Sequence, residues 1–186
     1  NDYALGWYSY DETDGDYALS HFSVGHDRRY VLRFAKEALA RNPKMRFFAS
    51  PWSPPAWMKQ SGRYNGGHIR MEKEVLSAYA RYLIAYLKAY EKEGVHISVL
   101  TPQNEWASDN NYPTCLWTGD EMRVFIADYL GPALRSSGLS CELWLGTING
   151  TGTLGGVGTR YNEYTQTVLD DEAARSYITG VAYQWE

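Results

Sequence analysis

Short apolar runs alternate with longer amphipathic stretches along this chain, and no other feature restricts its fold as strongly. Residues 73–93 carry apolar side chains at helical spacing, and Gly94 directly behind them is a typical helix end. We expect four strands, at residues 45–50, 95–100, 141–148 and 181–185, and four helices, at residues 28–40, 73–93, 118–134 and 162–177. Helices that alternate with strands in this way indicate βαβ units and a parallel sheet.

Polar and aromatic side chains follow the predicted strands, at residues 50–52, 103–105, 147–149 and 184–185. In a (β/α)8 barrel the carboxyl ends of all strands open on one face, and active sites lie there. The glycine-rich stretch 150–158 lacks the Gly-Lys-Ser/Thr of a phosphate-binding loop, so we expect an ordinary loop at this place. The pattern therefore favours a barrel over a doubly wound nucleotide-binding sheet.

Charge and residue usage argue against several classes of partner. The net charge is −4, whereas a nucleic-acid partner usually requires a basic patch. No apolar run approaches the roughly 18 residues of a transmembrane segment. The histidines are scattered, so no metal site is predicted. Cys115 and Cys141 have no metal-binding spacing, and we expect free thiols, with a disulfide between them as the alternative.

Aromatic residues are unusually frequent, with seven Trp and 16 Tyr. Such rings fill protein cores, and they also offer flat faces on which sugar rings pack. Composition does not decide between these roles, but we expect Trp57, Trp117 and Trp144 in core or loop packing. The acidic stretch from Asp11 to Asp16 predicts a solvated loop.

Glu105 has the clearest chemical potential. It follows the apolar run 95–100 in the stretch Thr101-Pro-Gln-Asn-Glu-Trp106. A carboxyl group in a cleft lined by tryptophans can keep a proton near neutral pH and donate it. Glycoside hydrolysis needs such an acid beside the leaving oxygen and a second carboxylate on the other side of the sugar. An ordinary polar loop after a strand would show the same local pattern.

Two longer motifs resemble glycoside hydrolase family 30. The first is Ser50-Pro-Trp-Ser-Pro-Pro-Ala-Trp-Met-Lys59, which is similar to a strand-loop motif of that family. The second is Thr101–Glu105 followed by Tyr112-Pro-Thr-Cys-Leu-Trp-Thr118, which resembles its acid/base segment. Residues 1–3, 8–10 and 180–185 also match, so the resemblance covers essentially the whole chain. It implies a glucosylceramidase-like, retaining β-glycosidase of the clan A type, with a (β/α)8 barrel and an attached β-sandwich.

The resemblance also implies roles for single residues. Glu105 falls at the acid/base position after strand 4, and Asn104 matches the adjacent contact to the sugar 2-hydroxyl. The other substrate-binding residues that it implies are Asp2, Trp52, Trp106, Gln184 and Trp185. Trp106 and Gln184 depart from the pattern, because glucosylceramidases have Pro and His at these positions. These departures leave the aglycone and the sugar open.

The same resemblance predicts that the site is incomplete. The family nucleophile is a Glu after strand 7, and the chain is expected to run from about strand 2 to strand 6. Glu186 lies one strand too early to replace it. We therefore expect residues 1–186 to form a single partial (β/α)8 catalytic domain, with the nucleophile, the remaining strands and the β-sandwich outside the chain. Alone, this piece would have unpaired edge strands and would be inactive.

The expected function is hydrolysis of O-glycosidic bonds in a carbohydrate or glycoconjugate, without a metal or organic cofactor. A role in sphingolipid metabolism would follow from the glucosylceramidase likeness, although the Tyr-Gln-Trp form at residues 183–185 suggests a microbial branch. Alternatives are an endo-glycanase of the same family (β-1,6-glucanase, xylanase or galactanase) and a catalytically dead carbohydrate-binding barrel. The compartment stays unknown, with a secreted or periplasmic location slightly favoured over the cytoplasm.

Overall fold

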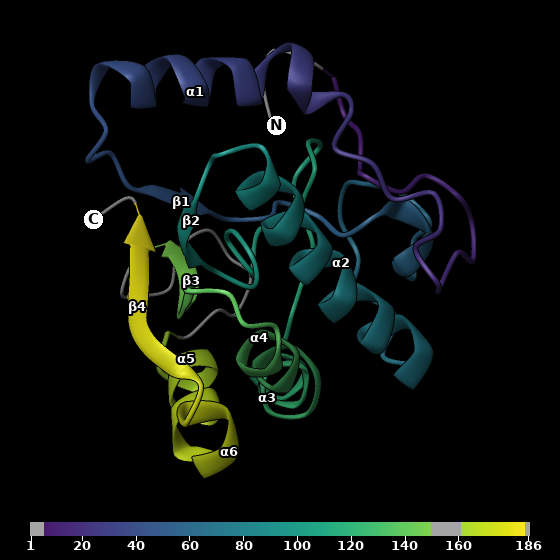
Figure 1. Ribbon diagram of the computed structural model, residues 1–186. Helices are drawn as coiled ribbons and strands as arrows, with labels where there is room; N and C mark the ends of the chain where they lie inside the picture. Colours follow the sequence, from purple (N-terminus) through teal and green to yellow (C-terminus); the bar gives the residue numbers. More distant parts are fainter. Residues whose placement is uncertain (1–5, 150–160, 185–186) are drawn as a thin grey trace.

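The computed structural model describes residues 6–149 and 161–184, which form a four-stranded parallel sheet with helices around it (Figure 1). The strands are β1 (Phe47–Ala49), β2 (Ile97–Leu100), β3 (Glu142–Asn149) and β4 (Ile178–Gln184). They lie in the order β1-β2-β3-β4, and every neighbouring pair is parallel. Each strand is separated from the next by helix, so the predicted βαβ order is confirmed.

The helices occupy the predicted segments, with breaks that the sequence pattern did not indicate. They are α1 (Val31–Arg41), α2 (Lys73–Lys92), α3 (Gly119–Phe125), α4 (Gly131–Ser136), α5 (Tyr161–Asp170) and α6 (Glu172–Arg175), with short 3-10 turns at Asp27–Arg29 and Ala56–Met58. A π-helical turn at Ile126–Leu130 joins α3 to α4. Thr118 and Glu121 form a capping box at the start of α3. Asp171 separates α5 from α6 and caps α6 through the Ala174 amide.

The start of the last strand was predicted three residues too late. β4 begins at Ile178, and Gly180 lies inside it, paired with Trp144 of β3. A Cβ atom on Gly180 would lie 2.8 Å from the Trp144 ring, so the missing side chain makes room for the indole. The glycine thus marks a close contact between two strands and does not mark a strand end.

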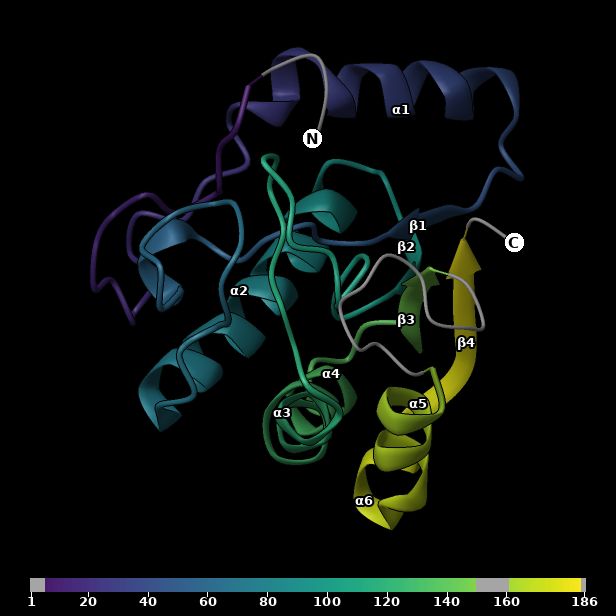
Figure 2. The ribbon, with the colours of Figure 1, turned by 180° about the vertical axis from the view of Figure 1, so that it is seen from behind.

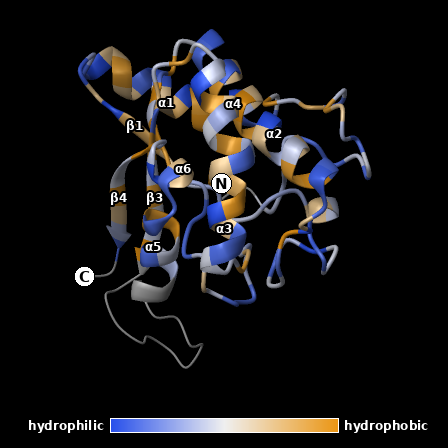
Figure 3. Cartoon of the chain, turned by 90° about the horizontal axis from the view of Figure 1, so that it is seen from below, coloured by the Kyte–Doolittle hydropathy of each residue, from blue (hydrophilic) through white to orange (hydrophobic). Residues whose placement is uncertain are grey.

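The core lies between the sheet and the surrounding helices. Tyr79 of α2 stacks on Phe125 of α3 at 5.3 Å, and Trp117 packs against both rings. The predicted core placement of Trp57 and Trp117 is confirmed, since both are buried. Seen from below, the strands and α4 carry many hydrophobic residues, whereas hydrophilic residues predominate on the loops (Figure 3). The two opposite ribbon views place α1 above the sheet and α5 and α6 at its other end (Figures 1 and 2).

The predicted solvated loop is wrong for Asp11. This residue is 1% exposed, and its carboxylate accepts a hydrogen bond from the Thr13 amide at 3.0 Å. Its carbonyl accepts a hydrogen bond from the Trp57 indole at 3.1 Å. Glu12 accepts hydrogen bonds from the Ser9 amide and the Tyr64 hydroxyl. The acidic stretch is therefore fastened to the surrounding loops, because buried acceptors need partners.

Cys115 and Cys141 are both free, as expected. In the part of the chain that the structure describes, no helix is long and apolar enough to cross a membrane. The same residues contain no group of three or more His, Cys, Asp or Glu that could hold a metal ion. β1 and β4 are the edges of the described sheet, and each exposes a large apolar side chain, Phe48 at 55% and Tyr183 at 41%.

Candidate active site

The segment Thr101–Glu105 connects the carboxyl ends of three strands. The Thr101 amide donates to the Ala49 carbonyl of β1 at 2.9 Å, and the Asn104 amide donates to the Pro51 carbonyl just beyond β1 at 2.8 Å. On the other side, the Glu105 amide donates to the Thr147 carbonyl of β3 at 3.0 Å. Because parallel strands end at one edge of the sheet, these bonds bring the side chains after β1, β2 and β3 together.

Gln103, for which the sequence pattern indicated no role, holds this junction together. Its side chain is fully buried, and its Nε2 donates to the Trp52 carbonyl at 2.8 Å and the Asn104 carbonyl at 2.7 Å. Its Oε1 accepts from the Trp117 indole at 3.2 Å. One side-chain amide thus pairs with three polar groups, the Trp52 carbonyl, the Asn104 carbonyl and the Trp117 indole. These bonds tie the backbone at Asn104 to the loop after β1.

Asn104 is held in one orientation by its own amide oxygen. The Oδ1 atom accepts a hydrogen bond from Thr147 Oγ1 at 2.8 Å and a longer one from Gln184 Nε2 at 3.3 Å. The residue is 8% exposed, and its Nδ2 atom has no hydrogen-bond acceptor among the described residues. The amide nitrogen is therefore the end of Asn104 that remains for a ligand oxygen.

Glu105 combines an uncommon backbone conformation with two hydrogen bonds to its carboxylate. Its φ angle is +44°, a left-handed value that a residue with a Cβ adopts at an energetic cost. Gln184 Nε2 donates to Oε1 at 2.7 Å, and Ser108 Oγ donates to Oε2 at 2.8 Å. The side chain is only partly buried. An oriented carboxylate on a strained turn at the open end of a sheet is an arrangement that suits proton transfer.

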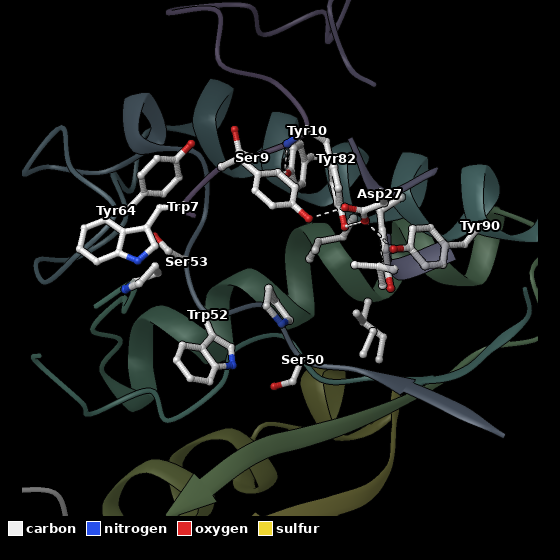
Figure 4. Close-up of a pocket in the computed structure, with 18 of the residues that line it drawn as sticks. Trp7, Ser9, Tyr10, Asp27, Ser50, Trp52, Ser53, Tyr64, Tyr82 and Tyr90 are labelled. Atoms are coloured by element: carbon white, nitrogen blue, oxygen red, sulfur yellow. Dashed lines mark hydrogen bonds between the residues drawn. The ribbon is translucent and has the colours of Figure 1, made fainter. Parts of the chain in front are cut away.

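Trp52 lies beside this junction and faces a cavity of about 380 Å³ (Figure 4). Its ring lies 5.4 Å from the Tyr112 ring, tilted by 53°. Trp7, Ser50 and Tyr64 also line the cavity. The rings and hydroxyls offer flat apolar faces next to polar groups, as sugar-binding surfaces do. Glu105 is not among the residues that line this cavity, whereas Ser50 and Trp52, which follow β1, are.

Asp27 also lines this cavity. This buried carboxylate accepts hydrogen bonds from the hydroxyls of Tyr8, Tyr10 (2.7 Å) and Tyr90 (2.5 Å). Burial, with Tyr90 nearby, raises the pKa of the Tyr10 hydroxyl well above its usual value. The tyrosines therefore stay protonated and donate to Asp27, which joins the amino-terminal segment to the end of α2.

Trp106 is placed differently from the substrate-binding residue that the sequence suggested. It is 7% exposed, and its ring lies flat on the Tyr164 ring of α5, with centroids 3.9 Å apart and planes within 5°. Its indole nitrogen has no hydrogen-bond partner among the described residues. With one face on Tyr164 and only 7% of its surface exposed, Trp106 has little surface left for contact with a sugar.

The remaining predicted site residues divide into two groups. Gln184 lies at the end of β4 and contacts Glu105 and Asn104, 79 and 80 positions away in the sequence. Asp2 and Trp185 lie outside the described residues, as does the predicted loop 150–158. The structure thus brings Asn104, Glu105 and Gln184 into direct contact, with Trp52 one loop away.

A parallel β/α sheet with a carboxylate and an amide at its carboxyl edge defines the class: part of a (β/α)8 barrel with its candidate site on the open face. The chain belongs to glycoside hydrolase family 30, because the pattern that defines the "Glycosyl hydrolase family 30 TIM-barrel domain" matches residues 1–186. The predicted family and the predicted partial barrel are therefore both confirmed.

Individual relatives have two kinds of name. "Putative glucosylceramidase 3" of Caenorhabditis elegans is 34% identical over 192 residues, which cover 99% of this chain and 35% of the relative. An endo-1,6-beta-D-glucanase of Neurospora crassa is 32% identical, over 95% of this chain and 35% of its own length. The chain thus spans about a third of the curated relatives that it matches.

Two solved structures show the same architecture. SrfJ from Salmonella typhimurium superimposes with a TM-score of 0.85 at 30% identity, over 98% of this chain and 39% of that one. The endo-beta1,6-glucanase BT3312 reaches a TM-score of 0.87 at 28% identity, over 98% of this chain and 40% of that one.

Proposed function

We propose that this chain forms the acid/base half of the active site of a retaining β-glycosidase. The observation that carries the proposal is the position of Glu105, at the junction of the β1, β2 and β3 ends and within 2.7 Å of Gln184 from β4. A general acid must be held in a defined orientation, and these contacts support such a role because they orient the Glu105 carboxylate. Membership of the family supports the same reaction class.

The proposed reaction has two steps, each of which moves one proton. A carboxylate in the remainder of the barrel bonds to the anomeric carbon while the glycosidic C–O bond breaks, and Glu105 protonates the leaving oxygen to give an alcohol. Glu105 then takes a proton from water, whose oxygen displaces the carboxylate and releases the sugar. The two carboxyl groups would stand roughly 5–5.5 Å apart, the separation of retaining enzymes.

The substrate contacts in this proposal follow the geometry of the site. The Asn104 Nδ2 atom would donate to a sugar hydroxyl, and Trp52 would offer a ring face to the sugar. Asp2 and Trp185 keep the sugar-binding roles that the family resemblance implies. Trp106 is omitted because its ring is covered by Tyr164. The domain organisation that we propose is one partial barrel over residues 1–186, completed by further strands beside β1 and β4.

The direct test replaces Glu105 in the full-length protein that carries this chain. Glu105→Gln should lower kcat/KM for alkyl β-glycosides by roughly 10²- to 10⁴-fold, the usual contribution of a general acid. Azide should restore turnover of activated aryl glycosides and yield a β-glycosyl azide, since azide attacks without a general base. Glu74→Gln, at an exposed position of α2, is the matched control. An unchanged rate in Glu105→Gln would refute the proposal.

A second candidate function keeps the chemistry and changes the substrate to a β-1,6-glucan. It is supported by relatives named endo-1,6-beta-D-glucanase, whose identities of 32% and 31% nearly equal those of the glucosylceramidase-named relatives. Incubating the full-length protein with glucosylceramide and with β-1,6-glucan separates the two. Release of glucose from the lipid alone supports a glucosylceramidase, and release of oligosaccharides from the glucan supports an endo-β-1,6-glucanase. Binding without any turnover would instead indicate a catalytically inactive carbohydrate-binding barrel.

A further inference from the structure

We propose that Ser108 and Gln184 are positioning residues that determine which oxygen of Glu105 carries the catalytic proton. The inference rests on the proposed acid/base role of Glu105 and adds a division of labour between its two oxygens. Gln184 Nε2 contacts Oε1 at 2.7 Å, and Ser108 Oγ contacts Oε2 at 2.8 Å. An amide nitrogen and a hydroxyl differ in what they do when the carboxylate gains a proton.

The Gln184 amide can present only its nitrogen to Glu105. The same Nε2 atom lies 3.3 Å from Asn104 Oδ1, so two acceptor oxygens face it. The orientation of Asn104 is fixed in turn by Thr147 Oγ1 at 2.8 Å. Turning the Gln184 amide over would place its oxygen against both acceptors. An amide N–H cannot accept a proton or a hydrogen bond, so Oε1 keeps its donor whether Glu105 is charged or neutral.

The Ser108 hydroxyl can reverse its direction. It donates to Oε2 while Glu105 is ionised, and it can rotate to accept from Oε2–H once the carboxyl group is protonated. A proton on Oε1 would instead face the Gln184 N–H. The proton of the acid form therefore belongs on Oε2, beside Ser108. In the glycosylation step it leaves Oε2 for the glycosidic oxygen, and in the second step Oε2 recovers a proton from water.

The polar groups around the carboxylate in the described residues are consistent with this assignment. β3 contributes Thr147 and β4 contributes Gln184, neither of which titrates. Asp109 follows Ser108 in the same loop, and its carboxylate lies against Gly66. Tyr112, further along that loop, lies against Trp52. The hydrogen bonds to Glu105 from Ser108 and Gln184 thus come from neutral side chains. Because neither donor titrates, the direction of these hydrogen bonds depends on the protonation of Glu105 itself.

Replacing Gln184, which donates to Glu105 in both protonation states, should change the pH profile of kcat/KM. In the full-length protein, Gln184→Leu removes a hydrogen bond that favours the ionised form of Glu105. The alkaline limb of kcat/KM should move up by about one pH unit. Gln184→Glu, which keeps the size of the side chain, should move it at least as far, because two carboxyl groups this close do not both ionise. Gln166→Leu, at an exposed position of α5, is the matched control and should leave the profile unchanged.

Replacing Ser108, whose hydroxyl can either donate to Glu105 or accept from it, should affect substrates differently according to their leaving group. Ser108→Ala should lower kcat/KM for alkyl β-glycosides about tenfold, whereas the rate on 2,4-dinitrophenyl β-glycosides, whose leaving group needs no proton, falls far less. Ser108→Thr keeps a hydroxyl and should recover most of the loss, and Ser140→Ala, at an exposed position, is the control. A general structural defect would lower both rates equally.

The outcomes distinguish this inference from the proposed function. An active protein whose alkaline limb stays in place in Gln184→Leu and Gln184→Glu would overturn the role of Gln184. Equal losses on both substrates in Ser108→Ala would overturn the role of Ser108. A wild-type protein without β-glycosidase activity would overturn the proposed function, and this inference with it.

Discussion

Asp27 and Glu105 both accept hydrogen bonds from neutral side chains, but the two carboxylates are held in different ways. Asp27 is buried and accepts from three tyrosine hydroxyls, those of Tyr8, Tyr10 and Tyr90. Glu105 is only partly buried, and its two oxygens accept from Ser108 and Gln184. Asp27 begins a 3-10 turn, whereas Glu105 has a positive φ of +44° at the end of a strand.

We interpret this difference as one between a structural anchor, Asp27, and the proposed reactive group, Glu105. The donors of Asp27 come from segments far apart in sequence, so the carboxylate joins the amino-terminal segment to α2 through three hydrogen bonds. The donors of Glu105 among the described residues include a hydroxyl, which can reverse its direction, and the side chain is only partly buried. Strain is also located at Glu105, where it has no evident benefit for stability. Stability is therefore expected to depend on Asp27, and chemistry on Glu105.

The largest effect on stability should come from Asp27. Asp27→Asn removes the charge that three hydroxyls are arranged around, and we expect a loss of about 3 kcal/mol in the free energy of unfolding. Glu105→Gln should change stability by less than about 1 kcal/mol while it abolishes most activity. Chemical denaturation of the full-length proteins measures both, with Asp14→Asn, at an exposed position, as the control. Equal stabilities of Asp27→Asn and wild type would remove the distinction between anchor and reactive group.

A smaller effect should link the reactive group to the packing of its strands. Gly146 of β3 has a φ of +126°, and a Cβ atom there would lie 2.4 Å from the Ala182 carbonyl of β4. Gly146→Ala should therefore push β4 away and cost about 2 kcal/mol. Because β4 carries Gln184, the variant should also lower kcat/KM for alkyl β-glycosides.

Gly138 provides the control for this substitution. It also has a positive φ, of +75°, but nothing lies within 4 Å of a Cβ built on it. Gly138→Ala should show only the cost of the backbone conformation, about 1 kcal/mol, and full activity. If Gly146→Ala behaves like Gly138→Ala, the spacing of β3 and β4 does not position the Glu105 carboxylate.

The sequence could predict the features that depend on local pattern. The alternation of helices and strands, the capping box at Thr118 and the place of Asn104 and Glu105 after β2 all follow from short-range rules. Features that depend on how the strands align could not be predicted from local sequence pattern. The Gln184–Glu105 contact joins residues 79 positions apart, and only the register of β3 and β4 brings them together.

Trp106 and Asp11 show the same limit at single residues. The positive φ of Glu105 turns the chain, so that Trp106 lies against Tyr164 of a helix whose position no local pattern indicates. Asp11 resembles its solvated neighbours in sequence, and only the Trp57 indole and the Thr13 amide reveal that it is enclosed. A residue type predicts the need for a partner, and the fold determines which partner is near.

The smallest effect on stability should come from removing one of the three hydroxyl groups that donate to Asp27. Tyr10→Phe removes one hydrogen bond to Asp27 but keeps a ring that can stack on Tyr82 and Tyr86, so we expect a loss of about 1 kcal/mol in the free energy of unfolding at neutral pH.

Burial raises the pKa of Tyr10 well above its ordinary 10.0, so above pH 10 the unfolded chain loses this proton while the folded protein keeps it. The folded state then binds more protons, and its stability falls as the pH rises. Tyr10→Phe should make this alkaline fall less steep, whereas Tyr30→Phe, at an exposed position, should not. Unfolding curves between pH 9 and pH 11 measure the slope, and an equal slope in both variants would show that Tyr10 does not keep its proton as a donor to Asp27.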